Sequence, residues 1–236
     1  LEEKKKIFEF NFYKKRFKKY KKKLFLITYQ DKLIVADNLG YVYCLNLNNK
    51  KISWAKNYGV PFRSNLKIIN DQVILASEDN KIFSINAENG EPFWQFATTL
   101  TQLKNEFLNN IIIDKFTQSI IFLNTSGELY SINYNNQKIN WILNFKSSGK
   151  DSLVDIFFAS PLVTMNKNLF ISTNNSLFNY NLTDGTNIWS VPIDTNLKPI
   201  ITKDNIFLVS KLNFLIFLDV KSGKVLWSRK INDLVK

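Results

Sequence analysis

Short hydrophobic runs alternate with polar turns along most of the chain. In one stretch an apolar run, Val73–Ala76, is followed by a polar turn at residues 78–81 and by a second short run, Ile82–Ile85. Runs of this length, bounded by Asn, Asp, Ser and Gly, are typical of β-strands joined by tight turns. The same pair of runs occurs five times with no helical stretch between them, so the pattern predicts an all-β fold.

The five tryptophans occupy the same place in a repeating unit. They are Trp54, Trp94, Trp141, Trp189 and Trp227, with spacings of 40, 47, 48 and 38 residues. Four residues before the tryptophan, three units have Gly90, Gly185 or Gly223, and the other two have Lys50 and Gln137. Each second strand ends in Asn or Asp, and Asn with Gly suits a turn that needs positive φ. A period of this size indicates a repeat architecture.

Another apolar run precedes each unit, so every unit is predicted to contain four short strands. Four antiparallel strands recurring at this interval describe the blade of a β-propeller. The five blades are predicted at residues 24–58, 59–98, 107–146, 157–193 and 197–232. A tryptophan at one fixed position would dock each blade against its neighbour, and its N–H would need a partner. We therefore predict a structural role for the five tryptophans, and not ligand stacking.

Composition removes much of the usual enzyme repertoire. The chain has 236 residues, of which 45% are hydrophobic, enough for a folded core. It has no histidine, which excludes Ser-His-Asp and Cys-His nucleophiles and His-containing zinc sites. Its one cysteine, Cys44, excludes an internal disulfide and any four-cysteine site. We predict no catalytic residue, no metal site and no cofactor.

The net charge of +12 is concentrated at the N-terminus. Residues 1–23 contain eleven Lys or Arg and three Glu, whereas the rest of the chain is only mildly basic. We predict that this basic N-terminal segment is a tether or outer strand leading into the first blade. Alternation at Phe8, Phe10 and Phe12 would suit an outer strand of the last blade.

Two other interpretations of the segment stay open. Helical spacing would make a basic amphipathic helix for an anionic membrane surface, through Phe10, Tyr13, Phe17, Tyr20 and Leu24. Basic residues interleaved with aromatic ones could also bind single-stranded nucleic acid, although we do not expect it.

The repeat has a family resemblance. It resembles the tryptophan-docking repeat of pyrroloquinoline-quinone-type propellers. The shared pattern is an aliphatic residue, Asn or Asp, three residues, Gly, three residues and Trp, as in SINAENGEPFW and FLDVKSGKVLW. Residues 61–90 and the segment FLNTSGELYSIN at 122–133 further resemble the BamB family, of alphaproteobacterial type. These are periplasmic lipoproteins of the outer-membrane β-barrel assembly machinery.

The resemblance carries several expectations. It implies a ring of about eight blades, of which this chain would hold five, and a signal peptide and lipidation cysteine upstream of residue 1. It implies a non-catalytic scaffold in the periplasm at the outer membrane. The scaffold would bind a protein of the barrel-assembly complex and help deliver unfolded outer-membrane proteins.

Quinoprotein dehydrogenases share the repeat, so a redox enzyme is the alternative function, with a generic binding propeller as a third. Such enzymes hold the quinone under a vicinal cysteine pair and place an Asp beside calcium. A single Cys44 cannot form that pair. Glu78 and Asp79 are adjacent carboxylates, but they fall at a predicted hairpin tip, where we expect them to be solvated.

Arg63 is one of three arginines in a lysine-dominated chain. It follows Phe62 at the start of a blade, where propeller loops reach the face of the disc. Arginine and aromatic residues are frequent anchors of protein interfaces. In the family that the chain resembles, an arginine at this place belongs to the partner surface. We therefore predict that Phe62, Arg63 and Ser64 bind the partner; alternatively, Arg63 pairs with an acid or carbonyl of a neighbouring blade.

Overall fold

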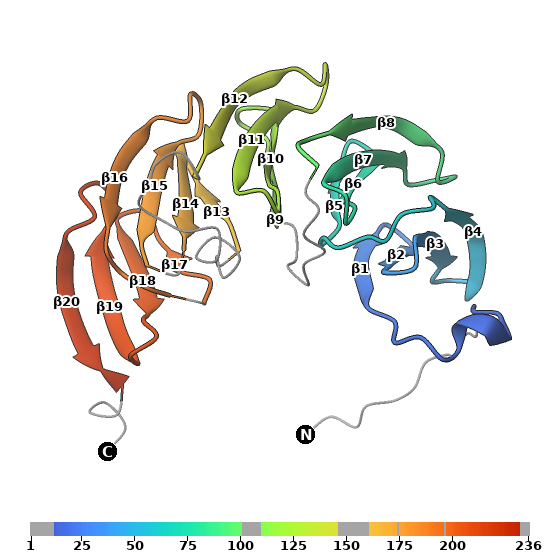
Figure 1. Ribbon diagram of the computed structural model, residues 1–236, viewed down its shortest axis with the longest axis horizontal. Coiled ribbons are helices and arrows are strands. Elements are labelled where there is room, and N and C mark those ends of the chain that lie inside the picture. The colour runs from blue at the N-terminus through green and yellow to red at the C-terminus, as the bar shows by residue number, and fades with distance from the viewer. Residues whose placement is uncertain (1–11, 101–109, 146–160, 174, 196, 232–236) are drawn as a thin grey trace. The chain divides into compact units, whose positions relative to one another are not determined.

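The chain forms five four-stranded antiparallel sheets in a computed structural model that describes residues 12–100, 110–145, 161–173, 175–195 and 197–231 (Figure 1). In each sheet the strands follow one another in chain order. The predicted all-β fold and its four-stranded blades are confirmed. No helix among these residues is long and apolar enough to cross a membrane.

The strands lie where the hydrophobic runs predict them. The first sheet contains β1 (Leu24–Tyr29), β2 (Lys32–Asp37), β3 (Tyr41–Asn46) and β4 (Lys51–Asn57). The second contains β5 (Lys67–Ile69), β6 (Gln72–Ala76), β7 (Lys81–Asn86) and β8 (Pro92–Ala97). The third contains β9 (Asn110–Asp114), β10 (Ser119–Leu123), β11 (Glu128–Asn133) and β12 (Ile139–Asn144). The fourth contains β13 (Val163–Met165), β14 (Asn168–Ser172), β15 (Leu177–Asn181) and β16 (Asn187–Val191). The fifth contains β17 (Ile200–Ile201), β18 (Asn205–Val209), β19 (Phe214–Asp219) and β20 (Val225–Lys230).

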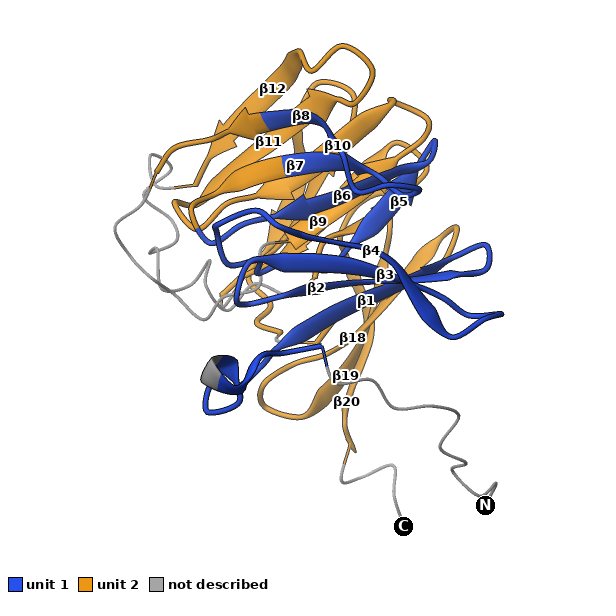
Figure 2. Ribbon diagram, turned by 90° about the vertical axis from the view of Figure 1, so that its right-hand side faces the viewer, with its two compact units in different colours: residues 1–78, 83–95 blue, residues 79–82, 96–236 orange. Residues whose placement is uncertain are grey.

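The chain divides into two compact units (Figure 2). Unit 1 contains residues 1–78 and 83–95, and unit 2 contains residues 79–82 and 96–236. In unit 1, one apolar core joins the facing sides of the first two sheets, with Phe62 among its fully buried members. In unit 2, one core is built around Trp141 and another around Phe170 and Leu218.

A β-bulge directs the tryptophan in four of the five sheets. Opposite β3, Cys44 pairs with Trp54 and Leu45 pairs with Ile52, so Ser53 is the extra residue. The same shift occurs beside Trp141, Trp189 and Trp227. A bulge bends its strand and re-aims a side chain. In these four sheets the bulge therefore lies at the same place relative to the tryptophan.

The basic N-terminal segment is described from residue 12 onward. Its only helical turn is the three-residue 3-10 helix η1 (Lys15–Phe17), so the amphipathic helix considered from the sequence does not form over residues 12–23. A dense run of like charges explains this, because neighbouring lysines repel one another along a helix. The proposed outer-strand residues Phe8 and Phe10, and the predicted blade starts at 107 and 157, lie outside the described residues.

Candidate interaction surface

Three tryptophans dock on the following sheet through one hydrogen bond each. The indole Nε1–H donates to the backbone carbonyl just after the last residue of the third strand. The pairs are Trp54 to Ala87 at 3.1 Å, Trp141 to Leu182 at 3.0 Å and Trp189 to Val220 at 2.9 Å. Each pair lies within one unit. This geometry, with a partner for each N–H, supports the docking role that the sequence predicts for these three residues.

A glycine lies directly against each of the three docked rings. Gly90, Gly185 and Gly223 have φ of +71°, +74° and +69°. A Cβ added at Gly90 would lie 2.6 Å from the Trp54 ring, and at the other two 2.8–2.9 Å from the ring that each faces. Glycine thus serves the turn and the docking at once. Lys50 and Gln137, which replace glycine at this turn position, also adopt positive φ.

Trp94 and Trp227 differ from the docked tryptophans. The Nε1 of Trp94 is buried and has no hydrogen-bond partner among the described residues. Trp227 is 37% exposed, and the Arg229 guanidinium lies 5.7 Å from its ring centroid. The docking predicted for these two residues stays a prediction.

A small polar residue follows the second strand's apolar run in every sheet, a regularity that the sequence analysis missed. The five residues are Asp37, Ser77, Asn124, Thr173 and Ser210, and all are buried. Four of them accept hydrogen bonds from backbone N–H groups of the next turn. At a turn, a short polar side chain of this kind accepts the backbone hydrogen bonds that a neighbouring strand would otherwise accept. The signal was available in the sequence, since each apolar run ends in D, S, N, T or S.

The predicted partner-binding residues surround this position in the second sheet. Phe62 is fully buried, and its ring centroid lies 5.6 Å from that of Phe83. Ser64 is also fully buried, and its Oγ accepts the Ala76 N–H at 2.6 Å. Only Arg63 reaches the surface, with a side chain that is 26% exposed. Phe62 and Ser64 can therefore position Arg63, which is the one member able to touch a partner directly.

Arg63 faces a carboxylate of its own sheet. Its Nη2 lies 3.4 Å from Oε2 of Glu78, and Asp79 forms a 2.7 Å ion pair with Lys81. The expectation that Glu78 and Asp79 are merely solvated is wrong, because Arg63, from the segment before β5, pairs with Glu78, and Lys81, at the start of β7, pairs with Asp79. Arg63 thus pairs with an acid of its own sheet, and the alternative of an acid or carbonyl of a neighbouring blade stays a prediction.

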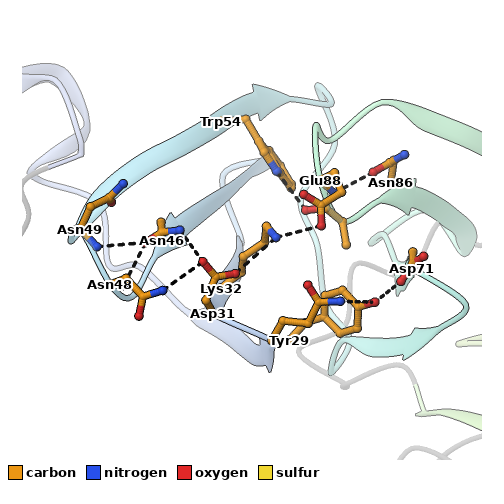
Figure 3. Close-up of polar contacts among 12 residues, drawn as sticks. Tyr29, Asp31, Lys32, Asn46, Asn48, Asn49, Trp54, Asp71, Asn86 and Glu88 are labelled. Carbon is orange, nitrogen blue, oxygen red and sulfur yellow. Dashed lines mark hydrogen bonds and ion pairs between the residues drawn. The ribbon is translucent and has the colours of Figure 1, made fainter.

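A second polar cluster joins the first two sheets (Figure 3). Lys32 lies 2.8 Å from Glu88, and this bond raises the pKa of the Lys32 ammonium. Tyr29 donates to Asp71, and Asn46 donates to Asp31 at 2.6 Å. These groups satisfy one another, so the cluster fixes the two sheets together in unit 1.

The chemistry of these groups suits surface recognition. Cys44 is buried on β3, and burial raises the pKa of its thiol, which disfavours the nucleophilic thiolate. Among the described residues no three His, Cys, Asp or Glu gather in a group that could hold a metal ion. The described part offers a ligand the Arg63 guanidinium and the exposed strand β20, among other surface groups.

Known proteins resemble this chain in sequence and in fold. A family model described as "Outer membrane protein assembly factor BamB" matches residues 24–229. The protein of that name from Yersinia pestis is 20% identical over 217 residues, which cover 86% of this chain and 52% of that protein. The chain thus spans about half the length of this relative.

Two solved structures are similar in fold. The crystal structure of BamB from Moraxella catarrhalis has a TM-score of 0.67 and 16% identity, over 84% of this chain and 61% of that chain. Quinohemoprotein alcohol dehydrogenase from Comamonas testosteroni has a TM-score of 0.66 and 10% identity, over 87% of this chain and 42% of that chain. At these identities the likeness is one of fold alone.

Proposed function

The chain belongs to the family of the outer membrane protein assembly factor BamB, and from that premise we propose that it is a non-catalytic scaffold for outer-membrane protein assembly. It would act in the periplasm, at the outer membrane, by binding a protein of the barrel-assembly complex. The observation that carries the proposal is the family match over residues 24–229, which reaches into all five described sheets.

Arg63 is the proposed contact with that partner. It lies next to the buried polar position after β6, and Phe62 and Ser64 hold its backbone in place. Arginines that are partly buried and held by neighbours are common interface anchors. Glu78 would be released from Arg63, or would share it, when the partner supplies a competing carboxylate or carbonyl.

Outer strands offer a second mode of contact, to extended client chains. All six residues of β20 are exposed, and β20 lies at the edge of the fifth sheet. An exposed strand edge can pair with an incoming extended peptide through backbone hydrogen bonds. We propose that unfolded outer-membrane proteins use this mode, while Arg63 serves the folded partner.

The test is a pull-down from envelope extract in mild detergent, with the whole chain as bait and bound proteins identified by mass spectrometry. We expect recovery of a barrel-assembly protein. The partner variant is Arg63→Ala, and the control is Lys56→Ala, which also breaks one ion pair of unit 1, with Glu91.

An anchor arginine is worth about 2 kcal/mol or more, so Arg63→Ala should weaken partner binding at least about tenfold. Lys56→Ala should stay within about twofold of the wild type in partner binding, because Lys56 lies outside the proposed contact and the loss of a partly exposed ion pair costs little stability. Failure of the wild type to recover any barrel-assembly protein would overturn the proposed function. If Arg63→Ala and Lys56→Ala recover equal amounts of the barrel-assembly protein, Arg63 does not contact that partner.

A further inference from the structure

We propose that residues 14–23, here called the basic stretch, are a docking surface for anionic phospholipid at a membrane surface, held on the first sheet by Phe12 and Tyr13. This interaction is separate from the partner contact at Arg63.

Two aromatic residues fix the stretch to the first sheet. The ring of Phe12 stacks on Tyr43 with a centroid distance of 4.5 Å, on the cluster formed by Val35, Tyr43 and Leu45. The Tyr13 hydroxyl donates to Oδ2 of the buried Asp37 at 2.5 Å. The chain from residue 14 onward therefore starts from a fixed point on folded protein.

The basic stretch carries a dense positive charge. Eight of its ten residues are Lys or Arg and none is acidic. Lys22 turns back and donates to the carbonyls of Phe17 and Lys18, which leaves the exposed ammonium groups on the outside. Those exposed lysines are Lys14, Lys15, Lys18, Lys19, Lys21 and Lys23. No described carboxylate lies within ion-pair distance of them.

The free side chains favour a lipid surface over nucleic acid. Single-stranded nucleic acid binds where successive aromatic rings are open for base stacking. Here Phe12 is stacked on Tyr43, Tyr13 is bonded to Asp37, and only Tyr20 is exposed, at 51%.

Exposed aliphatic side chains follow the stretch directly. Leu24 and Leu26 are both exposed on β1. Lysines beside a tyrosine and aliphatic groups match the headgroup region of an anionic bilayer, where phosphates meet acyl chains.

The experiment is sedimentation of the whole chain with vesicles of phosphatidylglycerol and phosphatidylcholine, compared with vesicles of phosphatidylcholine alone. The test variant reverses three exposed charges of the stretch: Lys18→Glu, Lys19→Glu and Lys21→Glu. The matched control reverses three exposed lysines of the fifth sheet, Lys203, Lys221 and Lys224, and so has the same net charge. Thermal unfolding checks that both variants are folded.

Each lysine near an anionic surface strengthens binding by about fivefold. We expect binding only to vesicles with phosphatidylglycerol, lost at high salt, and reduced at least about 100-fold in the test variant but far less in the control. Equal loss in both variants would overturn the proposal, because net charge would then explain the binding. Equal binding to neutral vesicles would also overturn the proposal. So would displacement of the protein from vesicles by single-stranded DNA at a concentration below that of the lipid, because the stretch would then prefer nucleic acid.

Discussion

The hydrogen atom that glycine carries in place of a side chain decides whether the Trp54 ring can dock. We expect Gly90→Ala to destabilise the protein by more than the cost of positive φ alone, because its Cβ would lie 2.6 Å from the ring. Positive φ costs a residue other than glycine about 1–2 kcal/mol, and displacement of the ring adds to it. Urea unfolding measures the total.

Gly59 provides the control for this prediction. It has a similar φ of +75°, but a Cβ there would meet nothing within 4 Å. Gly59→Ala therefore carries the backbone cost alone. If the two variants lose equal stability, the contact between glycine and tryptophan contributes nothing, and the turn explains the glycine.

The Tyr58 hydroxyl predicts a dependence of stability on alkaline pH. It donates to the Gly90 carbonyl at 2.6 Å, and burial, with a smaller effect of Glu91, raises its pKa to about 12. The ordinary pKa of tyrosine is about 10. Since the folded protein holds this proton more tightly, the stabilisation is complete below about pH 10 and declines as pH rises towards 12.

Tyr58→Phe isolates that contribution. The variant keeps the ring contacts with Phe62 and Phe83 and loses the hydroxyl. We expect it to be about 1 kcal/mol less stable than the wild type at pH 7, with the difference shrinking between pH 10 and 12. Unfolding free energies of both proteins across this range give the result. A difference that stays constant with pH would contradict the prediction.

At the scale of the strand, the β-bulge and the tryptophan work as one element. Trp141→Phe removes the bond to the Leu182 carbonyl in a buried place and should cost about 1–3 kcal/mol. The same change at Trp227, which follows the same bulge but is partly exposed, should cost less than about 0.5 kcal/mol. If the two substitutions cost equal stability, the tryptophan stabilises its own strand and not the contact with the following sheet.

The strands could be predicted from the sequence because their apolar runs are local signals. The runs at Val73–Ala76 and Ile82–Ile85 lie inside β6 and β7, and the positive φ of Gly90, Gly185 and Gly223 followed from turn chemistry. The ion pair of Glu78 with Arg63 could not be predicted from local signals, since the two residues lie far apart in the sequence and folding brings them together. The burial of Asp37 was also missed, because a carboxylate is rarely buried without a partner, and its partner Tyr13 lies 24 residues away.

For the whole molecule, fold and activity must be argued separately, because one fold supports many functions. The chain shares its fold with a quinohemoprotein alcohol dehydrogenase, at 10% identity. Quinoprotein dehydrogenases, which share the repeat that this chain resembles, are expected to hold the quinone under a vicinal cysteine pair. This chain has Cys44 alone, buried on β3, and so cannot supply that pair.

We therefore expect that pyrroloquinoline quinone, added with calcium, neither binds to the purified protein in equilibrium dialysis nor supports dye-linked dehydrogenase activity. A quinoprotein dehydrogenase reconstituted in parallel shows that the quinone and dye are competent. Saturable binding together with dye reduction in proportion to protein would make the chain an enzyme with another kind of quinone site. Binding without dye reduction would contradict only the expected absence of a cofactor.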